Sequence, residues 1–260
     1  MQQSATPPSD SATDLAREQI WVALLLAWVA AFSDAIGFLV LQQLGASFMS
    51  GNSMATGVAL GRLDWPSVLQ RGLPILAFFL GNMLGFLVLA LMRQWRSRSS
   101  FAVVFGLEAV CMLAFLVLGT HALQGGIIRP SPSGIFYLCA ALLTLAMGLQ
   151  TATVRRAAGQ GVRTTFVTGV LSDWAHAMAQ YLSWLRQQST ERQRREIVRD
   201  SMQQASFRHL RLLGGIWICY VVGAICGSAL ELRMALSALV FPLCVLVVLI
   251  VIDVFRPFEA

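Results

Sequence analysis

The amino-acid sequence predicts an all-α protein that crosses a membrane several times. Hydrophobic residues make up 57% of the 260-residue chain and charged residues 12%, against roughly 45–50% and 25% in ordinary globular domains. Several apolar runs approach the ~20 residues that an α-helix needs to cross a bilayer. The ~10-residue polar and apolar alternation of a membrane β-barrel is missing. Because backbone groups in lipid must be hydrogen-bonded within the spanning segment, these runs are expected to be helices.

Six apolar segments have the length and composition of membrane-spanning helices: 20–41, 73–92, 101–120, 134–153, 212–230 and 235–252. Two further segments are weaker. Segment 45–61 contains small residues throughout, and segment 164–184 carries Asp173 and His176 on one helical face. The fold class is therefore a helix bundle with about six spans and two short or re-entrant helices.

The rest of the chain is polar. Residues 1–19 are rich in Pro and Ser and are expected to form a disordered tail. A single transmembrane domain is expected over 20–252, followed by a C-terminal tail at 253–260. Within that domain, 185–211 contains seven arginines, which predicts a cytoplasmic connector near anionic lipid.

The distribution of the basic residues decides whether the two weak segments cross. All 19 basic residues are arginine. If all eight segments cross, 12 arginines lie on the side of the N-terminus and 7 on the other side. If the two weak segments do not cross, the numbers become 15 and 4. Since cytoplasmic loops carry the excess of positive charge, the six-span model is favoured, with both termini cytoplasmic.

The chain also repeats a short pattern in its two halves, 20–120 and 134–252. Residues 48–52 (Phe-Met-Ser-Gly-Asn) resemble residues 166–170 (Phe-Val-Thr-Gly-Val). Each motif follows a span with a small, polar end and precedes a span with glycines four residues apart. Three crossings in each half would give the halves opposite orientations, which predicts a 3+3 inverted repeat of the kind found in transporters.

The same stretches carry a resemblance to a known family. Residues 31–38 (Ala-Phe-Ser-Asp-Ala-Ile-Gly-Phe), 47–52, 146–150 (Ala-Met-Gly-Leu-Gln) and 162–169 (Val-Arg-Thr-Thr-Phe-Val-Thr-Gly) resemble the YoaK-type (UPF0700) bacterial membrane proteins. The resemblance covers about 20–252 and implies a bacterial inner-membrane protein with about six spans. It implies no catalytic or substrate residues, because the family is uncharacterised. Ser50 stands where the family often has Thr, which keeps the hydroxyl.

Asp34 is the strongest candidate for a functional residue, because it interrupts the apolar run 20–41. A carboxylate within a span costs at least about 2.5–3.5 kcal/mol on insertion scales, so it is expected to face a partner or an ion path. Two interpretations remain open: Asp34 carries a proton or a cation, or it is a structural group that bonds a neighbouring helix. Its expected partners are hydroxyls or amides of 47–53 or of 150–153.

Small polar residues supply the rest of the candidate binding site for a substrate or ion: Ser47, Ser50, Gly51, Asn52, Gln150, Thr168 and Gly169. If a half-helix begins near Ser50, its free N–H groups would favour an anion or a polar group. The alternative is a helix of small residues that packs tightly against its neighbours.

A second group of candidates is weaker. Glu108 lies within a span and is expected to pair with an arginine or a hydroxyl. The basic stretch with Arg155, Arg156 and Arg163 fits a phosphate or an anionic headgroup, or simply anchors the cytoplasmic side. Two glycine pairs predict close packing of helices within the chain rather than dimer faces: Gly81 with Gly85, and Gly223 with Gly227.

These features favour a transporter-like protein that moves a small solute or ion, with Asp34 as the coupling group. A second interpretation is a non-transporting membrane scaffold or a stress-related accessory protein. A third is a membrane enzyme that acts on a lipid-linked substrate, for which no hydrolase motif is present. No cofactor or metal is expected, and no cysteine pair has metal-ligand spacing. The expected partners are membrane lipid and an unknown solute or ion, and no nucleic acid is expected. The sequence leaves open whether the protein forms an oligomer.

Overall fold

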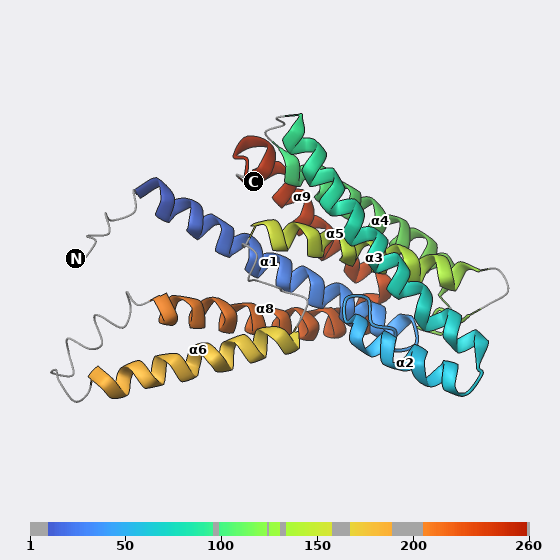
Figure 1. Ribbon diagram of the computed structural model, residues 1–260. Helices are drawn as coiled ribbons and strands as arrows, with labels where there is room; N and C mark the ends of the chain where they lie inside the picture. The colour runs from blue at the N-terminus through green and yellow to red at the C-terminus, as the bar shows by residue number, and fades with distance from the viewer. Residues whose placement is uncertain are drawn as a thin grey trace.

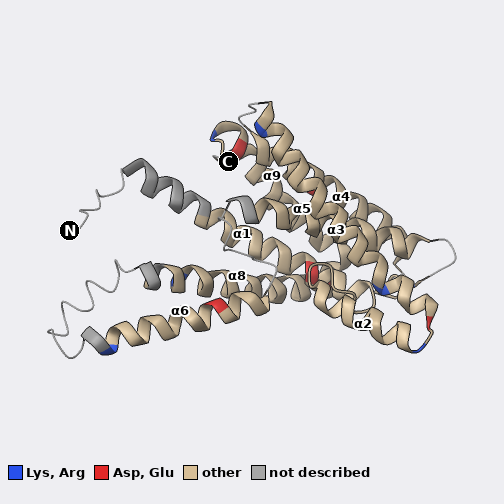
Figure 2. Cartoon of the chain, viewed as in Figure 1, with Lys and Arg blue, Asp and Glu red and all other residues tan. Residues whose placement is uncertain are grey.

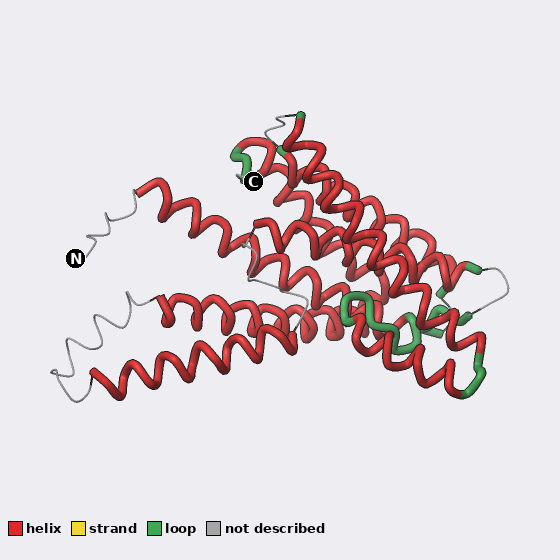
Figure 3. Tube along the Cα trace, viewed as in Figure 1, coloured by secondary structure: helices red, strands yellow, loops and turns green. Residues whose placement is uncertain are grey.

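The computed structural model describes residues 10–95, 99–123, 125–130, 134–157, 167–188 and 205–258. Every regular element in this part of the chain is a helix (Figures 1 and 3). The first half holds α1 (Asp10–Val40), α2 (Met49–Gly61), α3 (Trp65–Gln94) and α4 (Ser100–Ala122). The second half holds α5 (Ile135–Ala157), α6 (Val167–Gln188), α8 (Ala205–Met234), the 3₁₀ helix η1 (Ala235–Leu239) and α9 (Val240–Phe255). The predicted all-α membrane fold is confirmed.

Five segments of the described chain are long and apolar enough to cross a membrane: Ile20–Val40, Trp65–Gln94, Ser100–Ala122, Ile135–Val154 and His209–Phe255. The last one contains two helices, α8 and α9, with η1 between them. The chain reverses there, and Ala235 has a positive φ of 50°. Neither α2 nor α6 meets the same criteria. With 13 residues, α2 is about 20 Å long, which is shorter than the ~30 Å of the hydrocarbon core.

The contacts between helices give their relative directions. A Cβ atom on Gly223 would meet the backbone of Trp28, and one on Gly227 would meet Phe32, so α8 runs parallel to α1. Residue numbers rise together in α3 and α5 as well, because Gly81 lies against Leu145 and Gly85 lies against Leu149. Each long helix therefore packs along a helix of the other half of the chain.

The remaining pair runs in opposite directions. Gly119 of α4 lies against Leu236, while the Ala102 amide near the other end of α4 bonds to Asp253 of α9. Helix α5 also runs opposite to α1, because Gln150 bonds Leu26 while Leu143 meets Gly37. The helices α1, α3, α4, α5, α8 and α9 therefore alternate in direction along the chain. As a consequence, the beginning of α1 and the end of α9 lie at the same end of the bundle (Figure 1).

Glycines allow the closest of these helix contacts. An added Cβ would lie 2.2 Å from the Leu145 carbonyl oxygen at Gly81, and 2.4 Å from the Trp28 carbonyl oxygen at Gly223. At Gly85 and Gly227 the nearest atoms of α5 and α1 would lie 2.7 Å and 2.6 Å away, and an added Cβ on Gly148 of α5 would lie 2.4 Å from the Phe78 carbonyl oxygen of α3. Small residues at such positions let two helix backbones approach closely. The prediction that both glycine pairs pack within the chain is confirmed.

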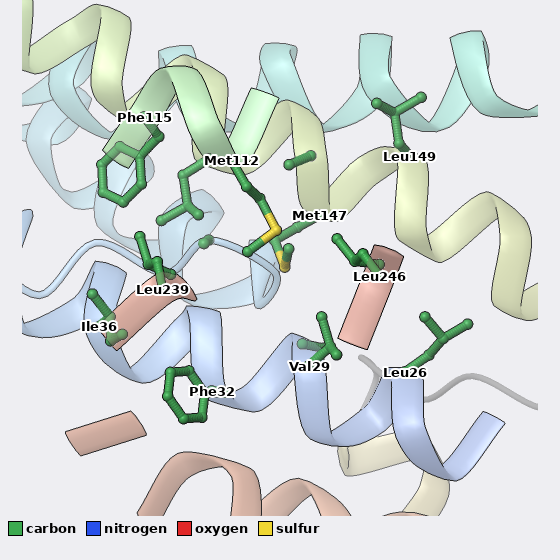
Figure 4. Close-up of a cluster of buried hydrophobic side chains, with 14 of the residues drawn as sticks. Leu26, Val29, Phe32, Ile36, Met112, Phe115, Met147, Leu149, Leu239 and Leu246 are labelled. Atoms are coloured by element: carbon green, nitrogen blue, oxygen red, sulfur yellow. The ribbon is translucent and has the colours of Figure 1, made fainter. Parts of the chain in front are cut away.

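The core of the molecule lies between α1, α4, α5 and α9 (Figure 4). In α1 and α5, 67% and 61% of the spanning window is buried, against 22% in α3 and 33% in α4. The central helices are therefore α1 and α5. Large apolar side chains such as Phe79, Val110 and Ile225 are exposed on the outside, as expected for surfaces that face lipid. Long stretches of helix carry no charge (Figure 2).

Three boundaries differ from the sequence predictions. Helix α1 begins at Asp10, so residues 10–19 are helical rather than part of a disordered tail, while 1–9 lie outside the described residues. Helices α6 and α8 extend into both ends of the expected connector 185–211, of which 189–204 lie outside the description. Finally, the expected C-terminal tail is packed, because Phe258 is buried against the ring of Phe101.

Candidate functional site

Asp34 is the centre of a buried hydrogen-bond cluster that joins three parts of the chain. The Ser47 backbone N–H donates to Oδ1 over 2.7 Å. Both hydroxyl donors reach Oδ2, one from Ser47 and the other from Tyr220 of α8 at 3.1 Å. Asp34 is only 3% exposed. Its carboxyl group therefore connects α1, the loop that precedes α2, and a helix of the second half of the chain.

Asn52 of α2 holds the same loop, residues 41–48, by hydrogen bonds to Gly45. Its Nδ2 donates to the Gly45 carbonyl over 2.7 Å, and the Gly45 amide donates back to Oδ1 over 3.4 Å. A side-chain amide that bonds both groups of one residue holds that residue in place as a backbone partner would. Gly45 is required there, since an added Cβ would lie 2.5 Å from the Phe48 ring.

The outer part of the loop is held by Arg71 of α3. Its guanidinium donates to the carbonyls of Gln43, at 3.0 Å, and Gln42, at 3.2 Å. Both glutamines have positive φ angles, 61° and 53°, directly after the end of α1. These carbonyls lie just beyond Val40, the last residue of α1, so Arg71 fixes the backbone where the chain leaves the helix. The loop after α1 is thus fixed by Asp34, Asn52 and Arg71 together.

The structure separates the predicted site residues into two groups. Ser47 is the partner that was expected for Asp34 within 47–53, and that contact is confirmed. Ser50, in contrast, is exposed, and half-buried Gly51 lies against the ring of Phe48. Neither of them makes a hydrogen bond to Asp34 among the described contacts. The expected polar segment is therefore reduced to Ser47 and Asn52.

None of the predicted site residues of the second half makes a described hydrogen bond to Asp34. Gln150 is buried in α5 and donates from Nε2 to the Leu26 carbonyl over 3.0 Å. Thr168 is exposed at the start of α6, and Gly169 is half-buried. Arg155 and Arg156 lie in the last turn of α5; their side chains, like the whole of Arg163, fall outside the described residues.

The surroundings of Glu108 differ from the sequence prediction. It is completely buried in α4, but neither carboxyl oxygen has a hydrogen-bond partner in the described structure. The expected pairing with an arginine or a hydroxyl is therefore wrong for the part of the chain that is described. Ser33 Oγ and Gln150 Oε1 are the other buried side-chain atoms without a partner there.

Sequence reasoning missed two contacts. Tyr220 lies one turn before Gly223, and the parallel register of α1 and α8 would have placed it near Asp34 once the glycine contact was known. Asp253 of α9 accepts the Ala102 amide over 2.7 Å and the Phe258 amide over 2.9 Å. It thereby caps the first turn of α4 from a distant part of the chain, an arrangement that has no local sequence signal.

The described residues contain no cluster of three or more His, Cys, Asp or Glu that would hold a metal ion. All five cysteines are free, and only Cys139 is fully buried. His176 of α6 contacts Gln180 on an exposed face, and Asp173 is exposed as well. These two residues therefore form a polar surface of α6.

Comparisons with known proteins agree with this fold. A model of a family described as "Protein of unknown function (DUF1275)" matches residues 22–252. The chain is similar to the UPF0700 transmembrane protein YoaK of Bacillus subtilis (strain 168), with 24% identity over 192 residues, or 74% of this chain and 79% of that protein. No solved structure matches. The family model covers nearly the whole length of this chain, whose helices are those of a multi-span membrane protein. The chain therefore belongs to the DUF1275 family.

Proposed function

We propose that this protein is a transporter-like protein of the bacterial inner membrane that moves a small solute or ion between two inverted halves. The observation that carries the proposal is the cluster at Asp34. One buried carboxyl group joins a central helix, the loop before a short helix, and a helix of the opposite half. A movement of one half against the other would have to break or remake these bonds, as in alternating access.

The helix contacts support two halves of similar design. In the first half α2 packs on α3, and in the second half α6 packs on α8. Across the halves, α1 packs along α8 and α5 packs along α3, each pair with glycines at the contact. The central helices are antiparallel, because Gln150 bonds Leu26 while Leu143 meets Gly37. Antiparallel central helices are what opposite orientations of the two halves require.

The 13-residue helix α2 and the 22-residue helix α6 both begin within the apolar depth of the bundle. Helix α2 starts two residues after Ser47, which is bonded to Asp34. Near the start of α6, Val170 is buried in a cluster with Ala27 and Ile216, both within apolar segments. From there α2 and α6 extend toward opposite ends of the bundle (Figure 1). Interrupted helices of this kind surround the substrate sites of many transporters.

The orientation that we propose places both ends of the described chain in the cytoplasm. These ends lie on one side of the bundle, and the arginines divide 15 to 4 in favour of that side in the six-span arrangement. Helices α2 and α6 then enter from opposite faces of the membrane without crossing it.

Thiol accessibility tests transport against the alternatives. After replacement of the five native cysteines, single cysteines at Ala35, Ser50 and Thr168 are treated with a membrane-impermeant thiol reagent from each side. A transport path predicts that Ala35→Cys and Ser50→Cys react from the outside and Thr168→Cys from the inside. Val110→Cys, at an exposed apolar position of α4, is the lipid-facing control and should not react. Protection of Ala35→Cys and Thr168→Cys to the level of this control would contradict the proposal.

Protection of Ala35→Cys and Thr168→Cys from the thiol reagent would favour a non-transporting scaffold. One observation supports this alternative: Ser47 and Tyr220 hold the Asp34 carboxyl group by three hydrogen bonds, in a centre whose helices touch through glycine. An enzyme is supported less well, because no second carboxyl group bonds to the Asp34 cluster in the described structure. Tyr220 is the only other titratable group that contacts Asp34 there.

A further inference from the structure

Glu108 is the one carboxyl group of the described core that the fold leaves without a bond. It lies on the buried face of α4 together with Val104, Phe105 and Met112, and it is 0% exposed. Asp34 and Asp253, the other buried carboxyl groups, each accept at least two hydrogen bonds. An isolated ionised carboxylate in an apolar core is so costly that such groups are paired, bound to a cation, or neutral.

A second unsatisfied oxygen lies at a similar depth. Met112 and Met147 lie close together in the core cluster (Figure 4), and α4 and α5 run in opposite directions (Figure 1). Glu108 lies one turn before Met112 in α4. Because α4 and α5 are antiparallel, Glu108 lies at the depth that α5 reaches about one turn after Met147. Gln150 occupies this level, and its Oε1 has no partner although its Nε2 is bonded to Leu26. Buried amide oxygens are rarely left unbonded, so this pair needs an explanation.

The chemistry of the unsatisfied atoms indicates what is missing. An ionised Glu108 is an acceptor only, and Gln150 Oε1 is an acceptor as well. No hydrogen-bond donor of the described chain reaches any of these three oxygens. The missing partner must therefore supply positive charge or a hydrogen. Oxygen ligands of this type suit a proton or a hard cation rather than a soft metal.

We propose that Glu108 and Gln150 form an internal site for a monovalent cation, H⁺ or Na⁺, in the core between α4 and α5. The inference rests on the proposed transport function and assigns its coupling ion to Glu108 rather than to Asp34. The oxygens of Asp34 are occupied by Ser47 and Tyr220, whereas those of Glu108 are not. Asp34 then holds the two halves together, and Glu108 binds the ion.

Few other ionisable groups compete with this assignment. The described titratable side chains on α4 and on the elements packed against it are Cys111, His121, Tyr137, Cys139, Arg71, Arg93, Cys244 and Asp253. None of them makes a described hydrogen bond or ion pair with Glu108. A change in the charge of Glu108 is therefore balanced by the bound cation and not by a neighbouring side chain.

Carbodiimide labelling tests this site directly, because the apolar reagent N,N′-dicyclohexylcarbodiimide modifies protonated carboxyl groups in membrane interiors. The purified full-length protein in lipid is labelled across a pH series, and the adduct is located by mass spectrometry. We expect an adduct on Glu108 whose yield falls about tenfold per pH unit above its midpoint, as for one titrating group. The exposed carboxyl groups Asp64 and Asp173 are read in the same spectra as controls for reagent loss.

A second series at fixed pH and ionic strength compares Na⁺ with choline. If Na⁺ suppresses labelling of Glu108, Na⁺ is the bound ion, and the suppression should be lost in Gln150→Met. If only a rise in pH suppresses labelling, the bound ion is H⁺. Glu108→Gln should abolish the adduct, and the wild-type series decides the question if that variant does not fold. Absence of an adduct at every pH, or an adduct that neither pH nor Na⁺ changes, would overturn the site. Since labelling needs no solute flux, this result is independent of the thiol accessibility test.

Discussion

At the scale of single residues, the buried carboxyl groups do different work in the same apolar surroundings. Asp34 accepts three hydrogen bonds and fixes a loop, while Asp253 accepts two and caps a helix. Burial is favourable for such groups only when their bonds are made, because an unsatisfied buried acceptor or donor loses its hydration without compensation. The hydrogen-bond partners, and not the burial alone, therefore distinguish the role of each carboxyl group.

Asp34→Asn is expected to lower the stability of the protein. The amide would turn a donor toward Ser47 or Tyr220, and a buried donor that loses its acceptor costs about 1–3 kcal/mol. Tyr220→Phe removes one bond and keeps the ring, so a smaller loss of about 1 kcal/mol is expected. Equilibrium unfolding in detergent measures both. Asp34→Asn with the stability of the wild type would show that the cluster does not hold the loop.

Asp253→Ala tests the cap that reaches α4 from α9. Loss of an N-capping acceptor costs about 0.5–2 kcal/mol, and a decrease in this range is expected from thermal unfolding. The matched control is Asp64→Ala, because Asp64 caps α3 through a longer, exposed bond to Ser67 of 3.4 Å. The control should have the smaller effect. An equal effect of the two substitutions would indicate that the buried position of Asp253 is unimportant.

At the scale of elements, the glycine contacts set the distance between helices. Gly81→Ala and Gly223→Ala would each place a methyl group within 2.4 Å of a carbonyl oxygen of the partner helix. Overpacking of this kind costs about 1–3 kcal/mol. Gly106→Ala is the control, since nothing lies within 4 Å of an added Cβ at that position of α4. It should stabilise the helix by up to about 1 kcal/mol. Unfolding curves that rank Gly106→Ala with the other two would contradict this packing.

The sequence predicted the elements better than their ends. Long apolar runs define α3, α4 and α5, because helix length and hydropathy in a bilayer follow from composition alone. The beginning of α1 was missed, since residues 10–19 are polar and only their continuation into an apolar helix makes them helical. The packed segment after α9 was missed because its order depends on Asp253 and Phe101, which bond and contact it from elsewhere.

The candidate site shows the same limit. Asp34 and Ser47 were predicted from the cost of a carboxylate in an apolar run and from the polar residues nearby. Tyr220, 186 positions further along the chain, was not, because its contact depends on the register between α1 and α8. The exposure of Ser50 also follows from tertiary structure, since the rotation of α2 about its axis is set by its packing on α3.

At the scale of the whole molecule, the proposed function requires a bundle in which α1, α3, α4, α5, α8 and α9 cross in alternating directions and α2 and α6 do not cross. The family match and the apolar helices establish a multi-span membrane protein. The inverted relation between the halves follows only if α2 returns to the side on which it starts. Full crossing by both α2 and α6 would instead give eight spans and halves of equal orientation.

The most direct test is the sidedness of the two ends of α3. In a background without native cysteines, Arg62→Cys lies before α3 and Trp95→Cys after it, both at exposed positions. An impermeant thiol reagent is added to intact cells and to inverted membrane vesicles. The account predicts labelling of Arg62→Cys from the periplasmic side and of Trp95→Cys from the cytoplasmic side. The reverse pattern at both positions would contradict the proposed arrangement, because it requires either that α2 crosses the membrane or that both termini lie in the periplasm.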